Sequence, residues 1–189
     1  MKRTLAALVL LLLLLTPLIA FGEGTPLPYG LSLGMTPDAA SAAFSADQTL
    51  AALTPEKLDY GNGVVEYAFD DVPIPDSNLI AQSFTVQIDK NNSANAERLS
   101  TLNYTFALTD GSIATFRAVL AMLREAYGEP DRDPMDDESA NGYVEWGTLY
   151  GNWTFEDVRV TLTLNRMYNE SVTLQFSSRL NYDKADLAQ

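Results

Sequence analysis

Apolar and polar residues alternate with a period of two in three segments of the chain, 64–69, 80–88 and 101–108. The apolar residues that we predict to share one face of these strands are Val65, Tyr67, Phe69, Ile80, Phe84, Val86, Ile88, Leu102, Tyr104, Phe106 and Leu108. Such alternation is typical of antiparallel strands with one buried face. The segments 71–78 and 89–97, which contain prolines and asparagines, predict the connecting loops.

Two segments have helical features instead. Thr36-Pro37-Asp38 combines a cap residue, a proline suited to the first turn and an acidic residue near the helix N-terminus, so a helix is predicted to begin there, resume at 49–53 and end before Thr54-Pro55. A second helix is predicted over 110–127, ended by Gly128 and Pro130. Its apolar residues recur at helical spacing: Ile113, Phe116, Val119, Leu120, Leu123 and Tyr127.

Strands are predicted again at 143–149, at 153–164 with a bend or split near Glu156-Asp157, and at 172–176. The last two would form a hairpin through 165–170, with the apolar residues of both strands on one side. The order helix, three strands, helix, three or four strands predicts an α+β protein in which helices pack on an antiparallel sheet. The halves, each about 70 residues, also suggest a tandem α-β-β-β pseudo-repeat.

The N-terminal segment 1–22 has the features of a cleaved secretory signal. Lys2 and Arg3 precede an apolar run, Leu5–Leu15, and small residues follow at Ala20 and Gly22. This run is shorter than the roughly 20 apolar residues that span a bilayer, so no stable membrane anchor is expected after cleavage. The predicted destination is secreted, periplasmic or cell-envelope. The remaining chain is predicted to comprise an extended leader (23–35), two α+β halves (36–109 and 110–181) and a C-terminal tail (182–189).

Composition removes several function classes. The 189 residues include 25 acidic and 12 basic residues, no His and no Cys, with a formal charge of −13. Without His or Cys there is no Ser-His-Asp triad, no Cys nucleophile, no thiolate or imidazole zinc site and no disulfide. The acidic balance argues against nucleic acid as a partner, because phosphate binding needs clustered Lys and Arg.

Three motifs suggest chemistry but have simpler explanations. Gly30-Leu31-Ser32-Leu33-Gly34 matches a nucleophile elbow, but the chain has no histidine base, so its glycines are expected to shape the approach to the first helix. The acidic segment 129–141 could hold calcium, yet its spacing does not match a calcium loop; a solvated loop that acts through net charge is expected. Glu66-Tyr67 and Glu145-Trp146 could supply the carboxyl groups of a glycosidase, or simply be outward residues beside buried rings.

Aromatic residues gather between 143 and 155. They would pack in the core of the sheet, or they would form a partly exposed surface for a partner, since Trp and Tyr contribute much of the contact energy at interfaces. The residues of this possible partner surface are Tyr143, Trp146, Tyr150 and Trp153.

Two segments resemble a known group of proteins. The sequence LSLGMTPDAA at 31–40 resembles a capped turn and helix start of small secreted bacterial domains, and LREAYGEP at 123–130 resembles a helix end that precedes a strand with a Trp, here Trp146. Together they are similar to the superfamily of β-lactamase-inhibitor-like proteins and small outer-membrane-assembly lipoproteins. The resemblance implies helical segments on antiparallel strands, in tandem in some members, and a noncatalytic protein-binding role. This chain has no Cys to carry a lipid.

The sequence therefore predicts a noncatalytic secreted or cell-envelope module that binds another protein or a cell-surface polymer. No catalytic, cofactor-binding or metal-ligating residue is assigned, and no cofactor is expected. Two alternatives stay open at this point: a carboxylate-based hydrolase of a cell-surface polymer, using for example Glu145 and Glu156, and a weak calcium-binding protein.

Overall fold

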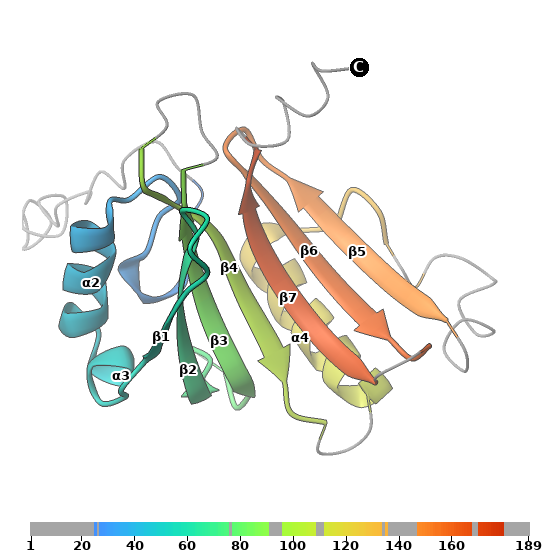
Figure 1. Cartoon of the computed structure of the whole chain (residues 1–189). Helices are drawn as coiled ribbons and strands as arrows, with labels where there is room; N and C mark the ends of the chain where they lie inside the picture. The colour runs from blue at the N-terminus through green and yellow to red at the C-terminus, as the bar shows by residue number, and fades with distance from the viewer. Residues whose placement is uncertain are drawn as a thin grey trace, which may run out of the picture.

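The computed structural model describes residues 25, 27–75, 77–90, 96–108, 112–133, 135, 147–167 and 170–179. Its elements, in chain order, are the 3-10 helix η1 (Pro28–Gly30), α2 (Pro37–Ala46), α3 (Gln48–Ala51), β1 (Glu56–Asp59), β2 (Val65–Pro73), β3 (Ile80–Asp89), β4 (Arg98–Phe106), α4 (Ser112–Tyr127), β5 (Thr148–Thr154), β6 (Val158–Asn165) and β7 (Ser171–Ser178). The seven strands form one antiparallel sheet in the order β1-β2-β3-β4-β7-β6-β5 (Figure 1). The prediction of an α+β protein with an antiparallel sheet is confirmed, and most of the ordered structure is sheet.

Pairing of β4 with β7 joins two groups of strands that are separate in the sequence. The register runs from Thr101 opposite Ser177 to Phe106 opposite Val172. On one side of this junction lie β1 to β3 and on the other β6 and β5, so a single sheet passes through both halves of the chain. The core is therefore continuous across the two halves.

The described α-helices α2, α3 and α4 all pack on the same side of the sheet. The aromatic ring of Phe44 on α2 lies 5.2 Å from that of Phe69 on β2, measured between centroids, and α4 packs on β6 and β7. In Figure 1, α4 lies behind β7 and β6, and no helix lies in front of them. The strand residues on the covered side are buried, among them Phe84, Leu102 and Leu162. Hence one side of the sheet makes the core, and no helix of the described residues lies on the other side.

The helix ends follow the chemistry of their residues. The Thr36 hydroxyl accepts a hydrogen bond from Ala39 N at 3.2 Å, and Pro37 begins α2, as predicted. Asp47 caps α3 by accepting from Thr49 N and Leu50 N at 2.8 and 3.0 Å. Gly128 ends α4 at a φ of 80°, a left-handed conformation that glycine adopts without a steric penalty.

Two predictions in the first half are corrected, and one strand was not predicted. The unpredicted strand β1 has no alternating pattern, because it is an exposed edge strand that pairs only with β2. β2 continues to Pro73, past a kink at Asp71 (φ 53°), into the segment predicted as a loop. Ile80 is 53% exposed, not buried with Phe84, because β3 and β4 change register between Ala81 and Ser83, and this bulge reverses which residues face the core.

In the second half the predicted helix and hairpin are confirmed. Leu120 and Leu123 of α4 are buried, and β6 and β7 pair from Asn165 opposite Ser171. The predicted strand 153–164 is split at 155–157, as one alternative required, so Trp153 belongs to the end of β5 and not to β6. Residues 143–146 of the predicted strand 143–149 lie outside the described residues. Of the remaining three, 148–149 form the start of β5.

The segment predicted as an extended leader contains η1 and contributes Tyr29 and Leu31 to the core. Thr25 Oγ1 donates a hydrogen bond to Asp157 Oδ1 at 2.8 Å, between β5 and β6, and the Tyr29 hydroxyl donates to Pro73 O at 2.8 Å, at the end of β2. This segment therefore ties the two halves together on the helical side of the sheet. Among the described residues no helix combines the length and apolar character needed to cross a bilayer.

We expect Leu120→Ala and Leu123→Ala each to lower the free energy of unfolding by about 2–5 kcal/mol, because both side chains are on the buried face of α4. Ile80→Ala is the matched control and should cost less than about 1 kcal/mol, because the bulge leaves Ile80 exposed. Urea unfolding of the three variants measures these values. A loss below about 1 kcal/mol at both leucines would mean that the packing of α4 differs from this structure.

Candidate functional site

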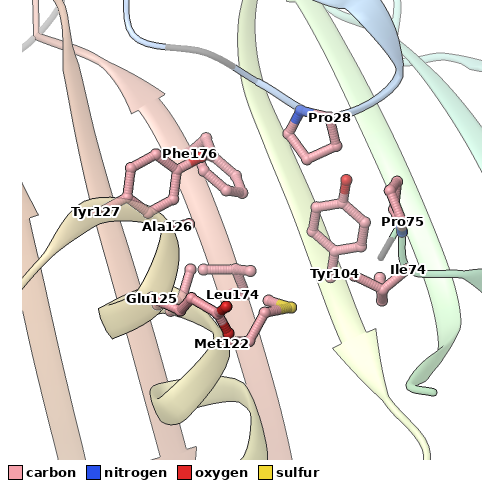
Figure 2. A pocket seen from close by; sticks show the side chains of 11 residues that line it. Pro28, Ile74, Pro75, Tyr104, Met122, Glu125, Ala126, Tyr127, Leu174 and Phe176 are labelled. Atoms are coloured by element: carbon pink, nitrogen blue, oxygen red, sulfur yellow. The ribbon is translucent and has the colours of Figure 1, made fainter. Parts of the chain in front are cut away.

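A pocket of about 340 Å³ lies on the helical side of the sheet, between α4 and the chain at Pro28 and at 74–75 (Figure 2). The C-terminal half of α4 forms one wall, Pro28 and the 74–75 segment form the other, and β4 and β7 form the floor. We call this the α4 pocket; its described lining residues are Pro28, Ile74, Pro75, Tyr104, Met122, Leu123, Glu125, Ala126, Tyr127, Leu174 and Phe176. Its volume is at the lower end of the range for small-molecule sites.

The pocket lies where the helical coverage of the sheet changes. α4 contacts β6 and β7, whereas α2 contacts β4 and α3 contacts β2, so the strip over the β4–β7 junction lies between the helices. Pro28, held by the hydrogen bonds of Thr25 and Tyr29, closes part of this strip. The pocket therefore forms at the β4–β7 junction, between the part of the sheet covered by α2 and α3 and the part covered by α4.

Tyr104 is the central residue of the pocket floor. Its ring stacks on Phe84 with centroids 4.5 Å apart and meets Phe176 edge-on at 6.3 Å. The residue is 1% exposed, and its hydroxyl is buried beside that of Tyr29. The Tyr29 hydroxyl donates its proton to Pro73 O at 2.8 Å, so its oxygen can accept from the Tyr104 hydroxyl.

Burial also keeps the tyrosines of this region protonated. It raises the pKa of Tyr104 well above its usual value, an effect that the nearby Tyr29 hydroxyl strengthens, and it raises the pKa of Tyr127 to about 12. The pKa of Tyr29 is raised by burial as well. At neutral pH the Tyr104 hydroxyl is thus a hydrogen-bond donor as well as an acceptor.

The other side of the sheet has a different chemistry. Its described outward residues on β3 to β7 are half-buried or exposed, and almost all carry hydroxyl or amide groups. We call this surface the polar face; its residues are Ser83, Thr85, Gln87, Thr101, Asn103, Thr105, Tyr150, Asn152, Thr154, Arg159, Thr161, Thr163, Thr173 and Gln175. Arg159 is the charged member of this set, in a chain of net charge −13. Further charged residues border the polar face: Asp89, which accepts from Gln87 Nε2, its register partner Arg98, and Glu66 and Asp70 on β2.

The strand register arranges the polar face in rows. One row runs across five strands, and its members are Thr85, Asn103, Gln175, Thr161 and Asn152. The next row consists of Ser83, Thr105, Thr173, Thr163 and Tyr150. Because hydrogen-bonded strands hold these side chains at fixed spacings, the polar face is a rigid and nearly uncharged surface.

The structure separates the residues of the predicted aromatic surface. Trp153 is 2% exposed, and its indole N–H donates to Gly128 O at 2.8 Å, so it belongs to the core and not to a surface. Alternation along β5 places Tyr150 on the opposite side, 40% exposed, with the Arg132 guanidinium 4.1 Å from the ring centroid. Tyr143 and Trp146 lie outside the described residues. Of the predicted surface, Tyr150 alone is both described and exposed.

In the acidic segment that starts at 129, two carboxylates share one arginine. Arg124 forms ion pairs with Glu129, at 2.9 Å, and with Asp133, whose other oxygen accepts from Met135 N at 2.9 Å. Among the described residues no group of three or more carboxylates is placed to hold a metal ion. Most of the remaining acidic residues of this segment lie outside the described residues, so calcium binding stays a separate question.

The other sequence motifs have structural explanations where the chain is described. Glu66 faces outward opposite Gln87, while Tyr67 packs against Phe44 with ring centroids 5.6 Å apart, as alternation predicted. Glu145 lies outside the described residues, so the hydrolase pair with Glu156 stays a prediction. Gly30 and Gly34 have φ angles of 67° and 85° and form the turns before α2, as expected.

No family model, no curated protein and no solved structure matches the chain. The α4 pocket and the polar face are therefore the features of the structure that bear on function. The sequence alone predicts neither of them. The alternation that predicts the buried strand residues also predicts that the threonines between them face outward, which is the chemistry of the polar face. The pocket cannot be predicted in this way, because it depends on the pairing of β4 with β7.

Raised pKa values of Tyr104, Tyr127 and Tyr29 predict a loss of stability in alkaline solution. An unfolded tyrosine loses its proton near pH 10, whereas these folded tyrosines keep theirs, so the stability they confer is complete below pH 10 and is lost as the pH rises toward about 12. Denaturant titrations at stepped pH values measure this slope. Tyr127→Phe should make the slope shallower, with the stability of the variant at pH 8 as its own reference; an unchanged slope would contradict the assignment.

Proposed function

We propose that this protein is exported to the cell envelope or secreted, and that it binds a partner protein noncatalytically through the polar face. The observation that carries the proposal is the pair of central rows of the polar face, from Thr85 to Asn152 and from Ser83 to Tyr150, which cross strands of both halves and contain only uncharged residues. The remainder of the protein is strongly acidic. A surface that avoids charge in such a chain is suited to contact, because the centres of protein interfaces are depleted of charged residues.

Size and edge chemistry support a protein as the occupant. Five strands about 4.8 Å apart span about 20 Å, which is comparable to the width of a standard interface of about 800 Å² per partner. Tyr150 and Arg132 lie together at one border of the polar face, and Tyr and Arg are the residue types enriched in interface hot spots. A cell-surface polymer is the other occupant that the test below distinguishes.

We also propose that the two halves are a tandem pseudo-repeat. In each half a helical segment precedes a set of antiparallel strands, and the last strands of the two sets, β4 and β7, pair with one another. This proposal agrees with the tandem arrangement and the protein-binding role that the resemblance at 31–40 and 123–130 implies. Under it, the polar face is a composite surface that neither half provides alone.

Export predicts a mature chain that begins near Glu23. The segment 1–22 has the charge, apolar run and small-residue spacing of a signal peptide, and Thr25, just after the expected cleavage site, is bonded to Asp157. N-terminal sequencing of protein recovered from the envelope or the medium measures this. Finding Met1 intact in exported protein would contradict cleavage and favour a membrane-anchored chain.

Binding through the polar face predicts that charge placed at its centre abolishes capture of the partner. Thr161 and Thr173 lie on the adjacent strands β6 and β7, in neighbouring rows, so Thr161→Arg with Thr173→Arg would introduce two unpaired cations into the contact. We expect at least a tenfold loss of partner recovery from envelope extract, measured by affinity capture and mass spectrometry, since unpaired buried charges are costly.

The matched control is Ala42→Arg with Ala121→Arg, which adds the same charges on exposed positions of α2 and α4. It should retain capture, and thermal unfolding should show both double variants folded. Equal recovery with both double variants would contradict the use of the polar face. Capture of a polysaccharide, lost in the threonine variants alone, would keep the face and replace the protein by a polymer.

A further inference from the structure

The two edges of the sheet differ in how they are covered. β5, at one border, is met by the segment after α4: Asp131 N donates to Asn152 O at 2.8 Å, and Arg132 forms a bridge with Asn152. β1, at the other border, pairs with β2 on one side, and no described residue forms a hydrogen bond with its backbone on the other (Figure 1). An edge with unpaired N–H and C=O groups is a template for a further strand.

The turn between β1 and β2 determines which backbone groups of β1 point away from β2. Tyr60 N donates to Val64 O at 3.1 Å, so the backbone groups of Tyr60 are directed toward the β2 side. Because this direction alternates along an antiparallel strand, Leu58 also bonds toward β2, whereas Lys57 and Asp59 present their N–H and C=O groups to the outside. The open edge therefore offers one donor and one acceptor at each of these two residues.

The side chains of β1 alternate between the two sides of the sheet. Lys57 is on the helical side, with Nζ 5.7 Å from the ring centroid of Tyr67, and Asp59 is two positions further along on the same side. Leu58 is half-buried on the side of the polar face, opposite Glu66. Short edge strands with charged residues often prevent pairing between sheets. Here the charges at Lys57 and Asp59 have opposite signs, so an antiparallel strand of the same sequence complements them.

We propose that β1 pairs with β1 of a second copy of this chain, antiparallel about a twofold axis at Leu58. In this register Lys57 lies opposite Asp59 of the second copy, so the outward N–H and C=O groups of both residues are paired and opposite charges face each other. The two Leu58 side chains meet at the closer, non-hydrogen-bonded spacing on the side of the polar face.

The other registers that keep the two sides of the sheet in place are unfavourable. An axis at Lys57 would place two lysines opposite each other and would pair Asp59 with Pro55, which has no N–H to donate. An axis at Asp59 would place two aspartates opposite each other, and like charges directly across a strand pair are destabilising. The sequence of β1 therefore selects the axis at Leu58.

This dimer joins the two sheets into one. The axis is perpendicular to the sheet, so the helices of both copies lie on one side and both polar faces lie on the other. Along β1 to β3, Leu58, Glu66 and Gln87 form one row on the polar side, and this row continues into the second copy. The dimer does not depend on the partner that we propose for the polar face, because it forms from the protein alone.

Sedimentation equilibrium of the purified protein over a series of concentrations tests the proposal. The buffer contains about 0.15 M salt, which limits the repulsion between two acidic copies to about 8 Å. We expect a reversible equilibrium between monomer and dimer. Lys57→Asp and Asp59→Lys each place like charges opposite one another at two symmetric positions, so each should weaken the dimer about tenfold or more. The double variant, Lys57→Asp with Asp59→Lys, exchanges the charges and should return to within about threefold of the unmodified protein.

Mixing the two single variants separates lost complementarity from lost folding. The Lys57→Asp chain and the Asp59→Lys chain carry opposite charges on β1, so the mixture should form a heterodimer although each variant alone is mainly monomeric. Lys57→Pro tests the backbone contribution, because it removes an N–H that points away from β2 and leaves the bonds to β2 in place. It should weaken the dimer more than Lys57→Gln, its matched control for the lost charge.

Each other outcome overturns the proposal. A protein that is still monomeric at about 1 mM would show that the edge of β1 does not pair. A dimer that is equally stable in both single charge variants would place the contact elsewhere, and a mixture of these variants that stays monomeric would contradict the register. Partner capture with the Thr161 and Thr173 variants is measured separately, so failure of the dimer and failure of the polar face are distinguishable.

Discussion

The antiparallel pairing of β4 with β7 is the interaction on which the rest of the structure depends. These strands are not consecutive in the sequence, yet they bring Tyr104 opposite Leu174 and Leu102 opposite Phe176 in one hydrophobic layer. Without this contact the chain would contain two smaller sheets, each with an exposed edge and part of a core. With it, both faces of the sheet extend from β1 to β5, and the core is shared by the two halves.

Joining the halves at this point also leaves space at the junction. Each group of strands is covered by its own helices, and the segment from Thr25 to Leu31 crosses between them through hydrogen bonds to Asp157 and Pro73. The α4 pocket remains where this coverage is incomplete, over Tyr104.

Charge is distributed unevenly over the molecule. Arg124 holds Glu129 and Asp133 beside the end of α4, whereas the two central rows of the polar face carry hydroxyl and amide groups and no charge. Threonine favours strands because its branched side chain suits the pleated backbone, so residues such as Thr161 and Thr173 serve the sheet and set its surface chemistry together. The result is a rigid neutral surface on an acidic protein.

Local patterns in the sequence determined the strands β2, β3, β4, β6 and β7, the helix α4 with its buried Leu120 and Leu123, and the cap at Thr36, because these features depend on residues only a few positions apart. Only the tertiary structure decided the exposure of Ile80, the burial of Trp153, the pairing of β1 and the existence of the α4 pocket. The bulge that exposes Ile80 is set by the register with β4, the indole of Trp153 is oriented by Gly128, and the pocket requires β4 beside β7. Each of these depends on partners distant in the sequence, which the periodicity of a single segment does not encode.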